Sequence, residues 1–343
     1  MIDLNNIVRK NIFDLKAYPS ARHENESGAA IWLDANENPY ETAYNRYPDP
    51  FQADVKHELG KVKDIQPSQI FLGNGSDEVL DVLMRVFCEP GKDNVIIMPP
   101  TFGMYKVLAN INDIKLVEVP LTKQLDIDTE AVLKAADDIT KIIFVCSPNN
   151  PTGNLMSTGA IEKLLRNFNG IVAVDEAYVD FSESNSLINL LDTYDNLLIS
   201  QTFSKAWGLA GARLGMAFAS KEVIEYMNKV KYPYNVNSHT QSLVIEALKN
   251  NELEANISTL LNEKSKLEDA LNGFECVEEI LPSDANFLLV KFKNSKQVFD
   301  KLIEQGISVR DRSKELYCEN GLRITIGTED ENIKVIETLS KMN

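Results

Sequence analysis

The stretch Ile171-Val172-Ala173-Val174-Asp175-Glu176-Ala177-Tyr178 is an apolar run that ends in two acidic residues. A short run of mainly β-branched residues without polar alternation is typical of a strand buried on both faces of a parallel sheet. Amphipathic helical segments alternate with similar runs between residues 70 and 220. These runs lie at 95–98, 116–119, 142–145, 197–199 and 215–218. The pattern predicts an α/β fold in which helices cover a largely parallel sheet and ligands bind at the carboxyl ends of its strands.

The alternation stops at residues 231–235, Lys-Tyr-Pro-Tyr-Asn, and two long helical segments follow at about 238–249 and 252–271. Strands at 286–292, 307–310 and 322–326 and helices at 296–305 and at the C-terminus predict a second, smaller α+β domain. The first 45 residues show little periodicity and are expected to form an arm lying on another surface. We therefore predict an arm that also contributes to the small domain (1–45), a large domain (46–237) and a small domain (238–343).

The composition argues against several classes of function. The 343 residues include 51 acidic and 35 basic side chains, and the resulting net charge of −16 opposes binding to nucleic acid or anionic lipid. No run approaches the roughly 20 apolar residues of a membrane-spanning helix, and the N-terminus does not resemble a signal peptide. The four cysteines and three histidines lack the spacing of disulfide scaffolds or metal sites. We expect a cytoplasmic protein without a bound metal.

The segment from Ser200 to Gly215 carries the sharpest chemical signal, because Lys205 follows a predicted buried strand and is flanked by small and apolar residues. An apolar environment favours the neutral amine, which is the form that adds to a carbonyl group. The nearby Ser204 and Arg213 are of the kind that binds a phosphate. The alternative is that Lys205 is an ordinary solvated lysine of the surface.

Polar groups also follow other predicted strands. Asp175 ends one strand, Asn150 precedes a turn-forming proline, and the turn at residues 73–78 opens a predicted helix whose free N–H groups suit a phosphate. Asp175 could instead cap a helix, and Asn150 could be only a turn residue. The turn lacks the third glycine of the dinucleotide fingerprint, and no P-loop motif is present, so a nucleotide enzyme is the weaker interpretation.

Taken together, these motifs resemble the signature of the fold-type I, pyridoxal-phosphate-dependent aminotransferases of the aspartate aminotransferase superfamily. The residues that carry the resemblance are Asn149-Asn150-Pro151-Thr152-Gly153, Asp175-Glu176-Ala177-Tyr178 and Ser204-Lys205 through Arg213. Five further motifs, in order along nearly the whole chain, narrow it to the histidinol-phosphate aminotransferase family; they lie at 33–39, 45–48, 73–78, 100–105 and 321–327. The resemblance implies a mostly parallel, seven-stranded sheet in the large domain.

The resemblance also implies pyridoxal 5′-phosphate as the cofactor, bound through a Schiff base to Lys205, which then moves a proton during the reaction. Asp175 would pair with the pyridine nitrogen and keep it protonated. Asn150 and Tyr178 would hydrogen-bond the ring hydroxyl, and Phe102 would stack on the ring. Members of the family often have tyrosine where Phe102 stands, so a hydrogen bond made by that hydroxyl is absent here.

The cofactor phosphate would be held by the backbone N–H groups of Ser76 and Asp77, the Ser204 hydroxyl and Arg213. Tyr47 resembles a tyrosine that reaches this phosphate from the neighbouring subunit, which implies a homodimer with shared sites. The alternative is that Tyr47 is a core or surface residue without a role in the site.

For the substrates, the resemblance assigns Arg323 to the carboxylate of glutamate, a bidentate task that suits arginine. Arg310 and Tyr18 would help to bind the phosphate of histidinol phosphate. Alternatively, Arg310 belongs to a solvated cluster of charges at residues 310–312.

The expected reaction is a ping-pong transamination between L-histidinol phosphate and 2-oxoglutarate, giving imidazole-acetol phosphate and L-glutamate, in histidine biosynthesis. Other activities of the same fold remain open, namely an aromatic or broad-range aminotransferase and a phosphoamino-acid decarboxylase. A pyridoxal-phosphate-binding regulator is the non-enzymatic alternative, although the chain has no appended DNA-binding module. A carrier-type binding protein is less favoured because no secretion signal is seen.

Overall fold

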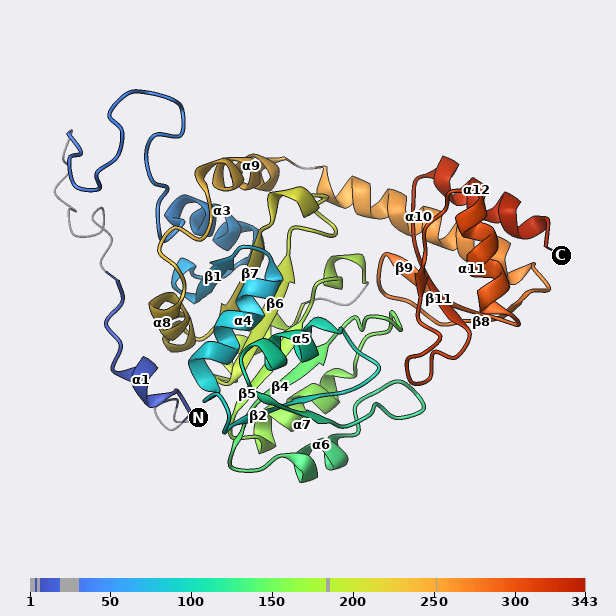
Figure 1. Cartoon of the computed structure of the whole chain (residues 1–343), viewed down its shortest axis with the longest axis horizontal. Helices are drawn as coiled ribbons and strands as arrows, with labels where there is room; N and C mark the ends of the chain where they lie inside the picture. Colours follow the sequence, from blue (N-terminus) through green and yellow to red (C-terminus); the bar gives the residue numbers. More distant parts are fainter. Residues whose placement is uncertain (1–3, 5–6, 19–30, 183–185, 251, 343) are drawn as a thin grey trace.

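The computed structural model describes residue 4 and residues 7–18, 31–182, 186–250 and 252–342. The larger part of the chain is built on a seven-stranded sheet (Figure 1) whose strands lie in the order β1-β7-β6-β5-β4-β2-β3. Strand β7 runs antiparallel to both of its neighbours, and the other adjacent pairs are parallel. The strands are β1 (Ile70–Gly73), β2 (Asn94–Ile97), β3 (Lys115–Glu118), β4 (Thr140–Cys146), β5 (Ile171–Asp175), β6 (Leu197–Thr202) and β7 (Gly215–Ala219).

Helices cover both faces of this sheet, because successive side chains of a strand point to opposite sides. In β4, Ile142 and Phe144 face one apolar core, whereas Ile143 and Val145 face the other. Each fully buried side chain of this size contributes about 1.5–3 kcal/mol to folding. The first core is completed by α1 (Lys10–Phe13), α4 (Ser76–Phe87), α5 (Met104–Ile111) and α8 (Lys221–Val230). The second is completed by α3 (Ala53–Lys63), α6 (Thr129–Ala135), α7 (Thr158–Asn167) and α9 (Ser238–Lys249).

A four-stranded antiparallel sheet, in the order β10-β11-β9-β8, forms the second part of the chain. Its strands are β8 (Val277–Ile280), β9 (Phe287–Phe292), β10 (Arg310–Asp311) and β11 (Gly321–Thr325), and its helices are α10 (Leu253–Asn272), α11 (Ser295–Glu304) and α12 (Glu329–Ser340). They share a separate core that includes Leu267, Val290 and Leu302. The predicted fold class, an α/β protein with a mostly parallel seven-stranded sheet and a smaller α+β domain, is confirmed.

Two details of the small sheet differ from the sequence-based expectation. Strand β8 was not predicted, because two acidic residues interrupt its apolar positions. The predicted strand at 307–310 is shorter and begins only at Arg310. Ile307 and Val309 instead pack, half-buried, against the core of the small domain.

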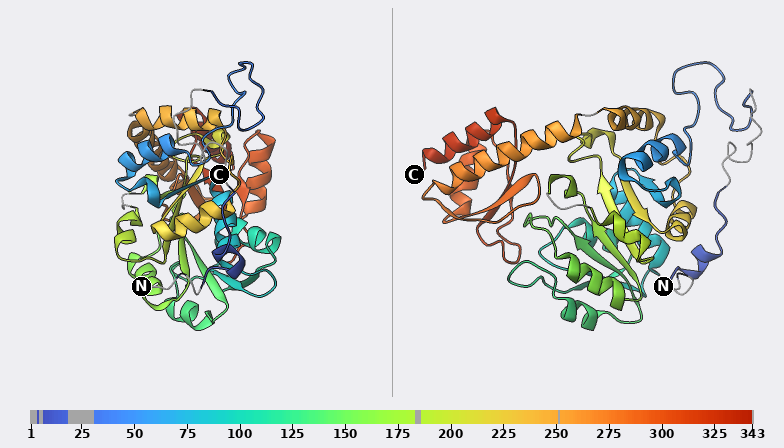
Figure 2. Two further views of the ribbon diagram at one scale, coloured as in Figure 1. Left: turned by 90° about the vertical axis from the view of Figure 1, so that its left-hand side faces the viewer. Right: turned by 180° about the vertical axis from the view of Figure 1, so that it is seen from behind.

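Helix α10 carries the chain from the large sheet to the small one, as the two opposite views in Figures 1 and 2 show. The preceding helix α9 still belongs to the large sheet, because Val244 and Leu248 are buried in its second core. We therefore propose that the large domain extends through α9 instead of ending at residue 237. Within the part of the chain that the structure describes, no helix has the length and apolar character needed to cross a membrane.

Four short 3-10 helices complete the described elements, and two of them lie near the carboxyl ends of the central strands. They are η2 (Pro67–Gln69), η3 (Val179–Phe181), η4 (Leu187–Asp192) and η5 (Ala210–Ala212). Residues 31–48 contain no helix or strand and extend away from the body of the protein as a loop beyond α3 (Figure 1).

Candidate active site

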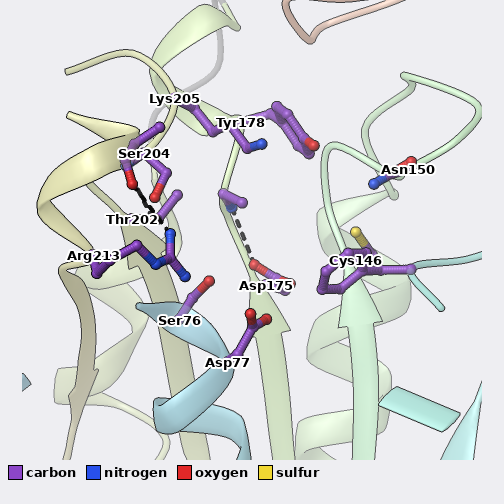
Figure 3. Close-up of a pocket in the computed structure, with 13 residues that line it drawn as sticks. Ser76, Asp77, Cys146, Asn150, Asp175, Tyr178, Thr202, Ser204, Lys205 and Arg213 are labelled. Carbon is purple, nitrogen blue, oxygen red and sulfur yellow. Dashed lines mark hydrogen bonds between the residues drawn. The ribbon is translucent and has the colours of Figure 1, made fainter. Parts of the chain in front are cut away.

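A pocket of about 200 Å³ opens at the carboxyl ends of β4, β5 and β6 (Figure 3). The strand register explains its floor, because Cys146 and Asp175 are aligned at the ends of β4 and β5, and Ser200 of β6 is aligned with Asp175. The structure brings nine of the residues predicted from the sequence to the wall of this pocket. They are Ser76, Asp77, Phe102, Asn150, Asp175, Tyr178, Ser204, Lys205 and Arg213.

One end of the pocket is built to receive an anion. Gly75 adopts a positive φ of 81° and precedes Ser76 and Asp77, the first residues of α4. The N–H groups of this first turn have no partner within the helix. The Arg213 guanidinium lies over the same turn, so close that a Cβ atom at Gly75 would be 2.6 Å from its nitrogen. Among the described residues, no carboxylate lies within ion-pair distance of Arg213, so its charge is available to a ligand.

Asp175 lies at the centre of the pocket and is buried. Its Oδ2 accepts a hydrogen bond of 2.9 Å from the Tyr105 hydroxyl, and its Oδ1 accepts from Ser200 Oγ at 3.1 Å and from the Ala177 N–H at 3.2 Å. Burial raises the pKa of Asp175, and these hydrogen bonds oppose the rise because they stabilise the carboxylate. Asp175 is therefore a buried acid whose charged form is supported by three donors.

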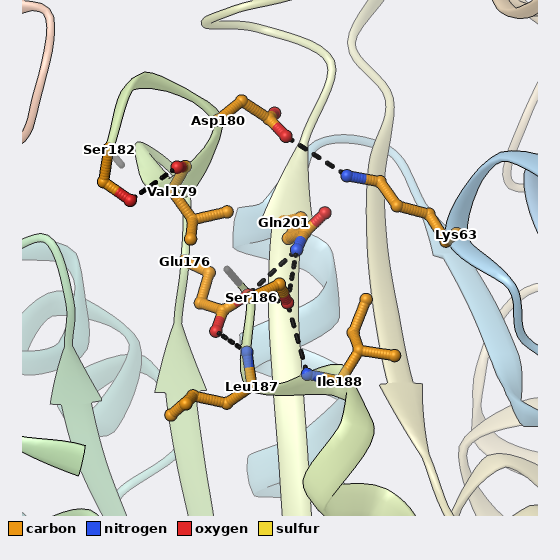
Figure 4. A network of polar contacts seen from close by, with 9 residues as sticks. All are labelled: Lys63, Glu176, Val179, Asp180, Ser182, Ser186, Leu187, Ile188 and Gln201. Atoms are coloured by element: carbon orange, nitrogen blue, oxygen red, sulfur yellow. Dashed lines mark hydrogen bonds and ion pairs between the residues drawn. The ribbon is translucent and has the colours of Figure 1, made fainter. Parts of the chain in front are cut away.

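The next residue, Glu176, points away from the pocket because adjacent residues of a strand face opposite sides. Its carboxylate accepts hydrogen bonds from Ser186 Oγ, from the Leu187 N–H at 2.8 Å and from Gln201 Nε2 at 2.9 Å (Figure 4). Close by, Lys63 forms an ion pair with Asp180. The hydrogen bonds of Glu176 fix the start of η4 behind the pocket. Of the two neighbouring acids, Asp175 therefore lies in the pocket, whereas Glu176 holds the structure behind it.

The Lys205 amine lies at the solvent-exposed mouth of the pocket, 5.5 Å from the centre of the Tyr178 ring. Partial burial lowers the pKa of Lys205, and the charges of Arg323 and Arg213 lower it further, while Asp175 acts in the opposite direction. A larger fraction of this amine is therefore neutral at a given pH than for an ordinary lysine. The neutral form is the one that reacts with a carbonyl group.

Tyr178 and Asn150 face each other across the pocket (Figure 3). Burial raises the pKa of Tyr178, so its hydroxyl stays protonated and is a hydrogen-bond donor. Its ring meets Phe287 of β9 edge-on, with the centroids 5.2 Å apart. The carbonyl oxygen of Asn150 accepts a hydrogen bond from Arg323 of β11, so the small domain contributes directly to the rim of the pocket.

Arg323 is half-buried, and its guanidinium lies 5.2 Å from the centre of the Phe287 ring. Its Nε is buried without a hydrogen-bond partner among the described residues. Arg310 is paired with Arg323 in the β10–β11 ladder, which places both side chains on the same face of the small sheet. Burial lowers the pKa of Arg323, and the charges of Arg312 and Arg310 act in the same direction.

The remaining predicted residues do not line the pocket of their own chain. Arg310 is exposed beside Arg323. Tyr18 is 73% exposed. Tyr47 is 47% exposed and stacks on Tyr234, with ring centroids 4.4 Å apart.

Several residues that shape the site carry no recognisable signal of a role in the sequence. Ser200 and Cys146 directly follow predicted strands beside the strand of Asp175, so the alignment of parallel strands is the signal that could indicate them. Tyr105 lies in one of the family motifs, but only its contact with Asp175 shows its importance. Arg312 is held by an ion pair with Glu315 at 2.8 Å, and its charge acts on Arg323.

A sequence model of the family described as aminotransferase class I and II matches residues 21–339. The chain belongs to this family. It is 49% identical over 341 residues to a histidinol-phosphate aminotransferase from Cytophaga hutchinsonii, covering 98% of each chain. It is 50% identical over 345 residues to a histidinol-phosphate aminotransferase from Flavobacterium johnsoniae, covering 99% of each.

The fold is also similar to a solved structure, that of histidinol-phosphate aminotransferase from Sinorhizobium meliloti in complex with pyridoxal-5′-phosphate. The TM-score is 0.77 at 21% identity, and the match covers 87% of this chain and 84% of that one. These comparisons confirm the predicted family and enzyme class, and membership of this family supports pyridoxal phosphate as the cofactor.

The residues of the pocket fit this cofactor. The anion-binding end, with Arg213 and the first turn of α4, suits its phosphate, and the buried carboxylate of Asp175 suits a protonated ring nitrogen. The Lys205 amine is placed to react with its aldehyde. Among the described residues, no cluster of three or more His, Cys, Asp or Glu side chains is placed to bind a metal ion.

Proposed function

We propose that this aminotransferase transfers the amino group between L-histidinol phosphate and 2-oxoglutarate, with imidazole-acetol phosphate and L-glutamate as the products, in histidine biosynthesis. The observation that carries this proposal is the near-50% identity, over almost the full length of both chains, to relatives named for this activity. The arginines on the face of the small sheet agree with a reaction in which both substrates are anions.

When bound, pyridoxal phosphate supplies the carbonyl that takes up the amino group and a ring that accepts the electrons released at Cα. With the cofactor bound, Lys205 would accept the proton of the substrate Cα and would later give it up again. Its lowered pKa suits this task, because the amine must be neutral to accept a proton near neutral pH. Asp175 would accept a hydrogen bond from the protonated ring nitrogen.

The other pocket residues would position the cofactor. Tyr178 and the amide nitrogen of Asn150, which line the pocket, would donate to the oxygen of the ring hydroxyl, and Phe102 would pack against the ring. The Ser76 and Asp77 N–H groups, Ser204 and Arg213 would hold the phosphate. The helix N-terminus and the arginine both favour a dianion there.

The substrate anions are bound from the small domain. Arg323 takes the carboxylate of glutamate, and its unpaired Nε is one of the donors for this bidentate contact. Arg310 lies beside it in the sheet and, with Tyr18, binds the phosphate of histidinol phosphate in the other half-reaction. The same face thus serves two different anions in turn.

The active form in this proposal is a homodimer in which residues 31–48 pack against a second copy. This segment exposes Ile31, Leu33, Tyr40 and Tyr44, each at least 66% accessible in the single chain. Exposed apolar residues gathered on one segment are typical of an interaction surface. Tyr47 would then reach the cofactor phosphate of the partner. The protein would act in the cytoplasm, in keeping with four unpaired cysteines, and would bind neither nucleic acid nor membrane.

The test is turnover of the purified protein supplied with pyridoxal phosphate. L-histidinol phosphate and 2-oxoglutarate should yield glutamate, and kcat/KM for L-histidinol phosphate should exceed the values for phenylalanine and threonine phosphate. A higher value for phenylalanine would indicate an aromatic aminotransferase, and release of CO₂ from threonine phosphate would indicate a decarboxylase. Cofactor binding without any turnover would favour a regulator.

A further inference from the structure

Tyr105 is a fully buried tyrosine of α5 that lies beneath the pocket. Its hydroxyl donates a 2.9 Å hydrogen bond to Asp175 Oδ2. Its ring stacks on Phe144 of β4, with centroids 4.9 Å apart and an interplanar angle of 11°. It forms an edge-to-face contact with the Phe102 ring, with centroids 5.5 Å apart and an interplanar angle of 89°. Tyr105 therefore contacts two residues that face the cofactor, yet it does not line the pocket.

The hydroxyl of Tyr105 is not needed to fill this space. Phenylalanine would make the same contacts with Phe144 and Phe102, whereas a buried hydroxyl group costs free energy unless it has a hydrogen-bond partner. Burial raises the pKa of Tyr105 well above its usual value, and the nearby Asp175 raises it further, so the hydroxyl remains a donor. The oxygen atom adds the hydrogen bond to Asp175 and an interaction with the neighbouring thiol of Cys146.

We propose that Tyr105 is a positioning residue that keeps the Asp175 carboxylate ionised and oriented towards the ring nitrogen of the cofactor. This inference rests on the proposed function, because it assigns to Asp175 the task of accepting the proton of the pyridine ring.

The two oxygens of Asp175 are supported unequally. Oδ1 accepts from both Ser200 and the Ala177 N–H. Among the described residues, only Tyr105 donates a hydrogen bond to Oδ2. Loss of the Tyr105 hydroxyl would leave that oxygen without a protein donor in a buried site, where an unsupported charge is costly.

The charge of Asp175 is set by groups from several elements. Asp77 of α4 and Cys146 of the neighbouring strand β4 line the same pocket, as do Tyr178 and Lys205 from the loops that follow β5 and β6. Asp77 raises the pKa of Asp175, in the same direction as burial, whereas the hydrogen bond from Tyr105 lowers it. Without that bond Asp175 would take up a proton at a higher pH. A neutral acid cannot hold the ring nitrogen in its protonated form.

The experiment compares Tyr105→Phe with the wild-type protein as apoprotein. Binding of pyridoxal phosphate is followed by absorbance between pH 5 and 8. Loss of one hydrogen bond to a charged group should raise the cofactor Kd about tenfold at neutral pH. The acid limb of the binding profile should move to higher pH by about one pH unit.

Ser200→Ala removes a donor to the other oxygen of Asp175 and should shift the acid limb in the same direction. Tyr194→Phe is the matched control. The Tyr194 hydroxyl accepts a hydrogen bond from Arg166 near the start of β6, at the opposite end of the sheet, so its loss should leave the profile unchanged.

An unchanged Kd and acid limb in Tyr105→Phe would overturn the inference. A lower melting temperature with an unshifted limb would do the same, because it would show a structural role only. If Tyr105→Phe does not fold, Ser200→Ala decides, and an unshifted limb in that variant overturns the inference. If the wild-type protein binds no pyridoxal phosphate, the proposed function itself fails, and this result is distinct from all the others.

Discussion

Arg323 of the small domain donates a hydrogen bond to the side-chain oxygen of Asn150 in the large domain, across 173 residues of sequence. The bond orients the Asn150 amide so that its nitrogen faces the pocket (Figure 3). One arginine thus belongs both to the proposed carboxylate site and to the support of the cofactor ring. A substrate that binds Arg323 therefore acts on a side chain already linked to the cofactor site.

Replacing Arg323 with lysine should impair the reaction with glutamate although the positive charge is kept. Lysine cannot form the planar, two-pronged contact with a carboxylate or hold Asn150 in the same way. We expect kcat/KM for glutamate to fall about 10- to 100-fold, as estimated for lost hydrogen bonds to charged groups. Steady-state kinetics with both amino donors measure the effect. Arg310→Lys is the comparison, and it should impair histidinol phosphate more than glutamate. If kcat/KM fell equally for glutamate and histidinol phosphate in both variants, the assignment of Arg323 to glutamate and Arg310 to histidinol phosphate would be contradicted.

Replacing Arg323 with glutamine should raise the pKa of Lys205. After burial, the charge of Arg323 is the strongest factor that lowers this pKa, so its removal stabilises the protonated amine. The amine would then be neutral only at higher pH. Trace acetylation of the apoprotein across a pH series, quantified for Lys205 by mass spectrometry, reports the midpoint directly. Glu315→Gln serves as a control for the loss of a nearby charged group. A midpoint that stays constant or falls in Arg323→Gln would refute the electrostatic coupling.

Mixing two inactive variants should restore activity if Tyr47 serves the partner subunit. In a heterodimer of Tyr47→Ala and Lys205→Ala chains, one site would contain both native residues and the other site neither. Lys205→Ala alone should lose at least about 10³-fold in turnover, the scale of a positioned acid–base group. Each heterodimer would have one intact site of two, and random refolding of an equal mixture makes about half of the dimers heterodimers, so the mixture should recover up to about a quarter of the wild-type activity. Activity no greater than the sum of the separate variants would place Tyr47 in its own chain's site or outside any site.

Lys231→Met should destabilise the fold at the base of the N-terminal arm. The buried amine donates to Pro50 O at 2.7 Å and, at 3.4–3.5 Å, to Tyr232 O, Pro233 O and Asn235 Oδ1. Methionine would leave these acceptors unpaired, so the free energy of unfolding should fall by about 1–3 kcal/mol. Urea titration measures the change. Lys221→Met, an exposed lysine of the same helix region, should have little effect.

The same lysine gives stability a defined pH dependence. Burial lowers the pKa of Lys231 to about 8, whereas the unfolded chain keeps a value of about 10.4. Between these values the unfolded state binds more protons, so the contribution of Lys231 to stability increases as the pH rises through this window. The wild-type protein should show this rise, and Lys231→Met should show less of it. If the free energy of unfolding of the wild-type protein fell between pH 8 and 10, with the same slope as that of Lys231→Met, this account would be contradicted.

The sequence predicted the parts of the site that depend on strand ends. Asp175 and Asn150 follow apolar runs, and parallel strands bring such ends to one edge of a sheet, so their proximity was foreseeable. Lys205 and Arg213 were recognisable from their neighbours in the chain. Tyr105 was not, because a tyrosine in an amphipathic helix looks like any core residue, and its bond to Asp175 depends on how α5 packs on the sheet.

The sequence pattern likewise does not show which core a buried side chain packs against. The apolar stripe of α9 predicted a helix correctly but not that Val244 and Leu248 would join the core of the large sheet. Ile307 and Val309 resembled strand residues, yet they pack on the small core without forming a ladder. Periodicity shows which face of an element is buried, and it does not show against what.

Apart from Tyr18 and Tyr47, the residues proposed for the cofactor lie in the part of the chain built on the large sheet, and those proposed for the substrates lie on the small sheet, which has a separate apolar core. Helix α10 joins the two, and Arg310 and Arg323 lie on neighbouring strands of the smaller sheet. Substitutions on that sheet can therefore alter which amino donors are accepted while the cofactor remains bound. This division makes the protein evolvable: new specificities are accessible through a few changes in β10 and β11, provided that the contact between Arg323 and Asn150 is preserved or replaced.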